Sequence, residues 1–455
     1  AEGGSFATGQ GALGWSGEHL AAAVSGLRTD GVDAAGASGE KDGSQALSGL
    51  VTGRFDLGAD WSLTWVGLAR QADSEFDSDT DFDGLLNDVG RRTQAEQRLA
   101  GAALAGRLGP LDHVVRASFN EVERDNFADG AITDVAKGQR TKLSWSPGLA
   151  AGVHTVTGLV DFERETYQRA DVEFGGATDA DEAFESVSFA GEYRLAAGAF
   201  DLAASVRHDD NRSRFDDATT WRLGAGYAPE GMGGRVRASI GTGIKNPTFT
   251  ELYGFFTGSF IGNPDLKPEE SQSWEIGWEQ ALGSVSYSAT YFEANLKNEI
   301  YTAFNPDFTS TALNRVGESE RSGVELAGRW QALANLSLSG QATLFDSQDD
   351  AGADEIRVPE MTASLSADWQ VQPDGLRIGL ALDHVGEQGD FDFGPFPSTL
   401  VELDAYTLAT LTAEYPLTER LALTLRGENI LGETATDVFG YNGPGAGVFL
   451  GLKLR

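Results

Sequence analysis

The chain has 455 residues, no cysteine, 58 glycines and a formal net charge of -35 at pH 7. The lack of cysteine excludes a disulfide framework and any metal site built from thiolates. The acidic balance argues against nucleic acid as a partner, because nucleic acid selects for a basic surface. No apolar run approaches the roughly 20 residues that a membrane-spanning helix needs.

Short segments in which apolar and polar residues alternate recur along the whole chain. In the segment 274–279, Trp274, Ile276 and Trp278 occupy one face, opposite two glutamates. Side chains alternate between the two faces of a β-strand, so this pattern predicts strands with lipid on one side and water on the other. The other clear segments are 61–66, 221–227, 235–240, 285–291, 336–339, 364–371 and 421–426.

The connections between these segments are alternately short and long. The short ones include 57–60, 196–198, 281–283 and 416–419. The long ones, which are polar and acidic, are 30–45, 73–91, 123–137, 165–181, 244–270, 346–355 and 388–399. Short turns at one end and long loops at the other are typical of bacterial outer-membrane barrels.

We therefore predict one domain over residues 1–455, an all-β, transmembrane antiparallel barrel. Counting the segments gives about 22 strands, with a barrel of roughly 16 or 18 strands left open. The residues Glu2–Thr8 are expected to form only part of the first strand. Tryptophans on the apolar faces, such as Trp65 and Trp221, are expected at the membrane interfaces.

Catalytic patterns are absent from the sequence, and we do not predict an enzyme. No nucleophile elbow and no phosphate-binding loop is present. Glu275 and Glu279 are interpreted as part of a hydrated wall rather than as an acid and base pair. The histidines lack metal-ligand spacing; they are His19, His113, His154, His208 and His384.

Two blocks of sequence resemble TonB-dependent outer-membrane receptors in order and spacing. The first block comprises Lys245–Pro247, Glu251–Gly254, Gly262–Glu270 and Ser273–Glu275, and the second comprises Asn429–Gly432 and Phe439–Gly445. The second block and the motif Leu252–Phe255 are similar to the cobalamin (vitamin B12) receptor subgroup in particular.

This resemblance implies TonB-dependent import of a scarce large solute across the outer membrane, with cobalamin or a related corrinoid as the expected solute. A ferric-siderophore receptor of the same family and a passive pore are the alternatives. The implied partners are TonB, the lipid bilayer with its outer-leaflet lipopolysaccharide, and the solute.

The family carries an N-terminal plug domain, through which its members contact TonB, and a terminal aromatic residue. Neither is found in residues 1–455. We therefore expect that the chain begins within the first barrel strand and stops one residue short of the aromatic position.

The resemblance also implies a calcium site in two extracellular loops. The run Asp73–Asp88 is not expected to be an EF-hand, because Gly90 stands where the bidentate glutamate is needed. The cobalamin receptors instead hold calcium between two loops. The residues that match their ligands are Asp33, Glu40, Asp42, Asp77 and Asp88, with Glu40 in place of the family's aspartate.

Aromatic residues in two loops are candidates for solute binding. Apolar faces at the mouth of a barrel suit a large amphipathic ligand such as a corrinoid or a metal chelate. The alternative is that these rings pack on each other and hold the loops. The candidates are Tyr253, Phe255, Phe256, Phe260 and Phe393, with Phe391 and Phe396 beside the last.

Overall fold

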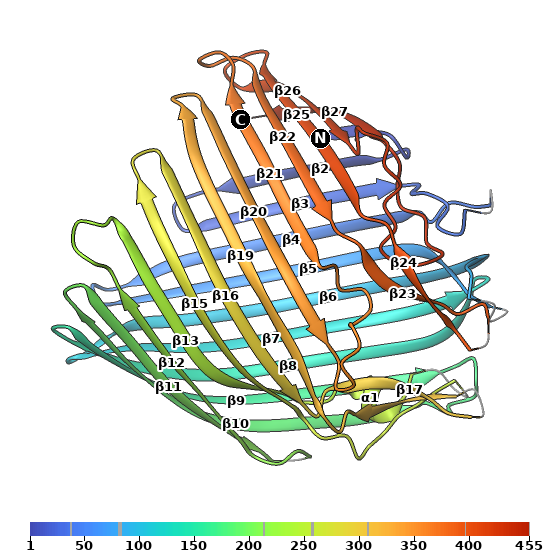
Figure 1. Cartoon of the computed structure of the whole chain (residues 1–455), viewed down its shortest axis with the longest axis horizontal. Helices are drawn as coiled ribbons and strands as arrows, with labels where there is room; N and C mark the ends of the chain where they lie inside the picture. Colours follow the sequence, from blue (N-terminus) through green and yellow to red (C-terminus); the bar gives the residue numbers. More distant parts are fainter. Residues whose placement is uncertain are drawn as a thin grey trace.

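One closed antiparallel sheet forms most of the chain in this computed structural model (Figure 1). The structure describes residues 1–36, 39–80, 84–212, 214–255, 259–306, 309–395 and 397–454. Within these ranges the sheet has 22 strands, which confirms the predicted all-β fold class. Its strands are β1 (Glu2–Gly4), β2 (Gly9–Ser16), β3 (Leu20–Thr29), β4 (Ser44–Leu57), β5 (Trp61–Ser78), β6 (Asn87–Leu108), β7 (Leu111–Ala128), β8 (Ala131–Ala151), β9 (His154–Asp171), β10 (Ala180–Ala197), β11 (Phe200–Asn211), β12 (Ala218–Tyr227), β13 (Gly234–Lys245), β15 (Glu269–Leu282), β16 (Val285–Lys297), β19 (Glu318–Leu333), β20 (Leu336–Gln348), β21 (Met361–Gln370), β22 (Arg377–Val385), β25 (Tyr406–Pro416), β26 (Leu421–Glu428) and β27 (Gly447–Leu454).

The sheet closes where β1 pairs with β27, so the two ends of the chain lie side by side (Figure 1). Glu2, Gly3 and Gly4 form this ladder. A Cβ on Gly4 would lie 2.1 Å from the Val448 carbonyl oxygen, so a larger residue does not fit there. Closure pairs the first described strand of the sheet with the last, as a sheet surrounded by lipid requires.

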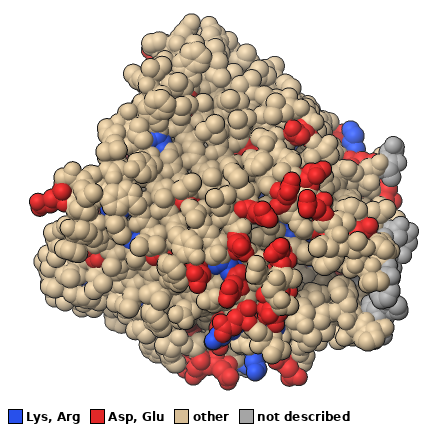
Figure 2. All heavy atoms as spheres, viewed as in Figure 1, with Lys and Arg blue, Asp and Glu red and all other residues tan. Residues whose placement is uncertain are grey.

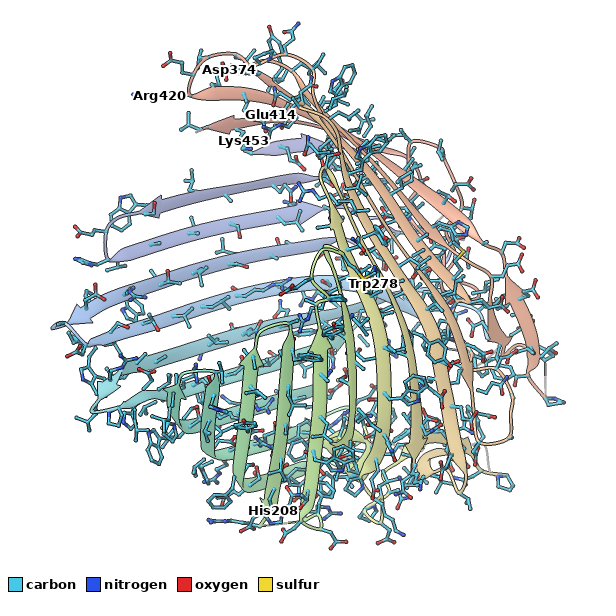
Figure 3. The ribbon with its side chains drawn as sticks, turned by 60° about the vertical axis from the view of Figure 1, so that its left-hand side comes forward. His208, Trp278, Asp374, Glu414, Arg420 and Lys453 are labelled. Atoms are coloured by element: carbon cyan, nitrogen blue, oxygen red, sulfur yellow. The ribbon has the colours of Figure 1, made fainter. Side chains whose placement is uncertain are left out.

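The two faces of the wall differ as the alternation predicts. Trp274 and Ile276 of β15 are exposed on the outside, and Trp278 lies on the same face (Figure 3). Glu275, on the inner face, accepts a hydrogen bond from Arg237 at 3.0 Å. The wall is therefore apolar toward lipid and polar toward the lumen.

The connections separate into a short-turn end and a loop end. Asp374 and Arg420 lie in turns at the short-turn end, and His208 lies near the opposite end of β11 (Figure 3). The long connections carry small elements of their own. These are α1 (Phe249–Tyr253), β14 (Phe260–Ile261), β17 (Ile300–Phe304), β18 (Ser310–Asn314), β23 (Gln388–Asp392) and β24 (Thr399–Leu403). In the described residues, no helix has the length and apolarity needed to span a membrane.

Local sequence explains the short helix α1 within the connection between β13 and β15. Thr248 caps its N-terminus, and Glu251 accepts a hydrogen bond from the Thr248 N–H at 2.7 Å. The helix ends at Gly254, whose φ of 79° is accessible to glycine at no steric cost. The family-like motif Glu251–Gly254 thus contains part of the cap and the stop of a helix.

One predicted loop is wrong. Residues 123–137 form the tops of β7 and β8, which are joined by the two-residue turn of Asp129 and Gly130. Both turn residues have positive φ, 49° and 80°, as a tight hairpin turn requires. These strand tops extend beyond the lipid-facing part of the wall, so apolar residues such as Phe127 and Ile132 are scattered among polar ones and the regular alternation that marks a strand is missing.

Candidate functional site

Four connections meet on one side of the loop end. Asn442 lies in the connection between β26 and β27, and Ala34 lies in the connection between β3 and β4. The Asn442 N–H donates a hydrogen bond to the Ala34 carbonyl oxygen at 3.0 Å. Gly84, between β5 and β6, lies so close to the β23–β24 hairpin that a Cβ there would be 2.3 Å from the Gly394 nitrogen. Gly84 has a φ of 86°, so both its backbone angle and its surroundings exclude a side chain.

Six carboxylates gather in the connection between β3 and β4 and in the ends of β5 and β6 beside it. Asp77 accepts the backbone N–H of Ala35 at 3.2 Å and that of Val89 at 3.1 Å, and so joins this connection to β6. Asp88 accepts the Glu40 N–H at 3.0 Å. We call this group the acidic cluster; it consists of Asp33, Glu40, Asp42, Glu75, Asp77 and Asp88.

The acidic cluster is electrostatically strained. Partial desolvation, followed by repulsion from Asp88 and three other members of the cluster, raises the pKa of Glu40 above its ordinary value. Burial also raises the pKa of Asp42, where a hydrogen bond from the Ala34 N–H opposes the shift and neighbouring carboxylates add to it. The charged form of both groups is therefore less favourable than that of an isolated carboxylate.

The donor chemistry of the acidic cluster fits a hard divalent cation. Calcium takes six to eight oxygen ligands, and carboxylates are its preferred side-chain donors. The predicted ligands Asp33, Glu40, Asp42, Asp77 and Asp88 all belong to the cluster. Across the described ranges, however, no group of three or more His, Asp or Glu side chains has an arrangement that encircles an ion. The carboxylates accept backbone N–H groups instead, so binding an ion would require them to turn inward.

The candidate aromatic residues separate into two classes. Tyr253 and Phe260 pack against a small loop core of Leu252, Leu266 and Ala312. They therefore hold the loop together, as the alternative interpretation predicts. Burial raises the pKa of the Tyr253 hydroxyl, and Arg214 lies over its ring at 5.3 Å.

Phe255 and Phe393 remain accessible, with 43% and 44% of their surfaces exposed. Phe255 leans on Phe260, with ring centroids 4.9 Å apart, and Phe393 leans on Phe391 at 6.0 Å. Phe256 and Phe396 lie outside the described residues. Of the candidates that the structure describes, Phe255 and Phe393 have the most exposed apolar surface.

Sequence analysis missed Asp390, the buried carboxylate that joins three of the loops. Its side chain is fully buried, and one oxygen accepts from the Arg357 guanidinium at 2.9 Å. The other oxygen accepts the backbone N–H of Phe439 at 2.8 Å. Asp390 precedes the aromatic residues of this hairpin, but its partners come from other loops, and no local pattern identifies them.

The lumen wall carries a second group of charges, between β8 and β11. Asp161 is almost fully buried and pairs with Arg207 at 3.0 Å and Lys142 at 3.6 Å. Lys142 also contacts Glu163 at 3.1 Å, and Arg207 contacts Asp209 at 2.8 Å. We call this group the wall network. Its residues lie on the polar inner face of the wall, as Glu275 of β15 does.

A family model described as "TonB dependent receptor-like, beta-barrel" matches residues 4–430 of the chain. The chain belongs to this family. Membership confirms the suspected receptor barrel, its place in the outer membrane and the prediction that it is not an enzyme.

Several relatives of the chain are named "Vitamin B12 transporter BtuB". The one from Photobacterium profundum is 28% identical over 448 residues, which cover 94% of this chain and 67% of the relative. The one from Vibrio vulnificus is 26% identical over 406 residues, 86% of this chain and 61% of the relative. The one from Vibrio cholerae is 29% identical over 64% of this chain and 45% of the relative. The chain thus spans between about half and two thirds of these proteins.

Solved structures with the same fold include the siderophore receptor PirA from Acinetobacter baumannii and the copper transporter OprC. PirA superimposes with a TM-score of 0.81 at 13% identity, over 99% of this chain and 78% of that one. OprC superimposes with a TM-score of 0.78 at 13% identity, over 100% of this chain and 79% of that one. At these identities the likeness establishes the receptor-barrel fold alone.

Proposed function

We propose that this receptor barrel takes part in the TonB-dependent import of cobalamin or a related corrinoid across the outer membrane. One contact carries the proposal. The connection between β5 and β6, which is flanked by Asp77 and Asp88 of the acidic cluster, meets the hairpin that bears Phe393 where Gly84 lies against Gly394. A cation-dependent pair of loops beside exposed aromatic rings suits capture of a large amphipathic solute. The names of the relatives at 26–29% identity support cobalamin over other solutes.

Calcium would act on the loops rather than on the solute. Burial and then repulsion between carboxylates raise the pKa of Glu40 and Asp42, and calcium bound by the acidic cluster would remove the repulsion and so order the connection 30–43. That connection touches Asn442 and lies beside Asp77, so its order extends to the neighbouring loops. Transport itself would require TonB and the plug domain through which the family contacts it.

The proposal is tested by measuring equilibrium binding of cobalamin and of ferric siderophores to the protein that carries this barrel together with its plug. We expect saturable cobalamin binding that weakens by about 5- to 150-fold when calcium is chelated, the usual range for coupled sites. Saturable siderophore binding with none for cobalamin would instead assign the alternative receptor function. Steady ion conductance of the same protein in planar bilayers would assign a passive pore.

A substitution distinguishes a solute contact from a loop contact. Phe393→Ala removes an exposed ring, so we expect cobalamin affinity to fall by roughly tenfold while unfolding is unchanged. Phe260→Ala removes a ring from the loop core and serves as the comparison, because it should loosen the loop whether or not solute is present. Equal cobalamin affinity for wild type and Phe393→Ala would contradict the assignment of Phe393.

A further inference from the structure

A hollow of about 630 Å³ lies on the barrel near its loop end, across β12, β13, β15 and β16. We call it the outer-wall hollow. Its lining includes Trp221, Thr242, Gln272 and Asn295. Lys267 and Lys297 also line it.

The hollow opens to the outside of the barrel rather than to the lumen. Asn295 and Lys297 share the face of β16 that carries Tyr291, which is exposed. Gln272 shares the outward face of β15 with Trp274, its exposed neighbour two residues on. Asp216 and Asp217 before β12 and Lys267 and Pro268 before β15 complete its lining at the loop end.

The hollow lies on the loop side of the membrane interface, at the level of the outer leaflet's sugars. Trp221, Trp274 and Tyr291 are exposed on the outer wall and form the aromatic belt that marks a membrane interface. Trp274 and Tyr291 lie in contact, with ring centroids 5.3 Å apart. On the face of the molecule that Figure 2 shows, charged side chains gather toward the loop end, and the rest of that face carries few of them.

The chemistry of the hollow suits an uncharged sugar. An indole presents a flat apolar face to the C–H groups of a sugar ring, while amides and hydroxyls both donate to and accept from its hydroxyl groups. Four carboxylates also line the hollow, and Lys297 is already paired with Glu318 at 3.0 Å. The net charge therefore disfavours direct contact with a phosphate. The four are Asp216, Asp217, Glu270 and Glu318.

We propose that the outer-wall hollow binds a neutral hexose of an outer-leaflet glycolipid. The acyl chains of such a lipid would lie along the apolar faces of β13 and β15, where Ala238 and Ile276 pair across the strands. Anchoring in the bilayer raises the effective concentration of the sugar at the hollow, so a shallow site is sufficient. The barrel would then hold one glycolipid at a fixed place on its wall, independently of the solute that its loops capture.

The proposal is tested by native mass spectrometry of the protein released from nanodiscs of two kinds. One kind contains lipopolysaccharide with a hexose-bearing core, and the other contains lipopolysaccharide without hexoses. We expect one retained glycolipid from the first kind and about tenfold less retention from the second. The double variant Gln272→Ala/Asn295→Ala should lower retention of the hexose-bearing lipid by about 30-fold, since hydrogen bonds from two amides are lost.

Gln45→Ala/Gln71→Ala is the matched control, because it removes two exposed amides from β4 and β5, away from the hollow. It should retain the lipid as the wild type does. Equal retention of both lipopolysaccharides, or equal losses in the two double variants, would overturn the proposal. If the free core oligosaccharide, without its lipid, binds as tightly as the intact glycolipid, then the hollow takes soluble sugars and the membrane-borne assignment is wrong.

Discussion

The wall network and the acidic cluster are both rich in carboxylates, but only the first contains its own counterions. Asp161 lies between Arg207 and Lys142, and each neighbouring carboxylate also has a cationic partner. In the acidic cluster, by contrast, no carboxylate pairs with a Lys or Arg of the described chain, and backbone N–H groups are the donors. The wall therefore contains its own counterions, whereas the cluster balances its charge only with backbone N–H groups among the described residues.

This difference predicts opposite responses to the loss of a charge. Removing one partner from a buried pair leaves the other uncompensated and destabilises the fold. Neutralising one member of a group of like charges removes repulsion and stabilises it. The predictions that follow use these opposite signs.

The largest effect is expected for Arg207→Ala in the wall network. It would leave the buried Asp161 with only its longer ion pair to Lys142, at 3.6 Å, and we expect a loss of roughly 3 kcal/mol in the free energy of unfolding, measured with urea in lipid vesicles. Arg116→Ala is the control, because Arg116 forms no ion pair within the part of the chain that the structure describes. Equal stability of the two variants would show that the network contributes nothing.

Asp390→Asn tests whether a paired carboxylate in the loops behaves like one in the wall. The amide would lose the charge that Arg357 contacts at 2.9 Å, and we expect about 1–3 kcal/mol less local stability. Hydrogen exchange of the β23–β24 hairpin is the measurement, with the exposed Asp404→Asn just beyond the hairpin as the control. Unchanged protection in Asp390→Asn would mean that the hairpin does not depend on this contact.

Glu40→Gln should act in the opposite direction. Its side chain faces other carboxylates, so without calcium the variant should protect the connection 30–43 from hydrogen exchange a few-fold better than wild type does. Its calcium affinity, measured by calorimetry, should nevertheless fall, because one ligand oxygen becomes neutral. Weaker protection in the calcium-free variant would contradict the repulsion that distinguishes the cluster from the wall.

The smallest effect is expected from a change of pH, which acts on the acidic cluster. The pKa values of Glu40 and Asp42 are raised in the folded loops, so the folded loops bind more protons than the unfolded ones. Loop stability should therefore rise as pH falls from neutral toward the ordinary carboxyl range near pH ~4. Exchange protection of residues 30–36, compared between neutral and mildly acidic buffer, measures it. Saturating calcium should abolish the dependence, and a dependence that persists with calcium would exclude the cluster as its source.

Sequence alone predicts those parts of the molecule whose two sides meet different solvents. In β15, Trp274 and Glu275 alternate because one faces lipid and the other faces the lumen, so the strand can be recognised without its neighbours. The hairpin of Asp129 and Gly130 escapes such a prediction because water surrounds both faces of the strand tops. The turn chemistry is present, but the apolar alternation is not.

The loop site is less predictable, because its contacts join residues that are distant in the chain. The resemblance to cobalamin receptors selects Asp33 and Asp77 as possible ligands, and the structure places them in one cluster. Neither the burial of Asp390 nor its contact with the Phe439 N–H, 49 residues further on, has any local pattern. The two classes of aromatic residue, packed and exposed, likewise become distinct only when the loops are assembled.

The long hairpin of β7 and β8 has a thermodynamic consequence. Its neighbour β6 has 22 residues, or about 70 Å of extended chain, whereas a tilted crossing of the bilayer uses roughly 10 residues. This side of the mouth is thus built from ladder hydrogen bonds that already exist before a solute arrives. A surface ordered in advance loses little conformational entropy on binding. The connections that lack such a ladder therefore lose most of the conformational entropy when a solute binds, and changes in those connections should alter the affinity most.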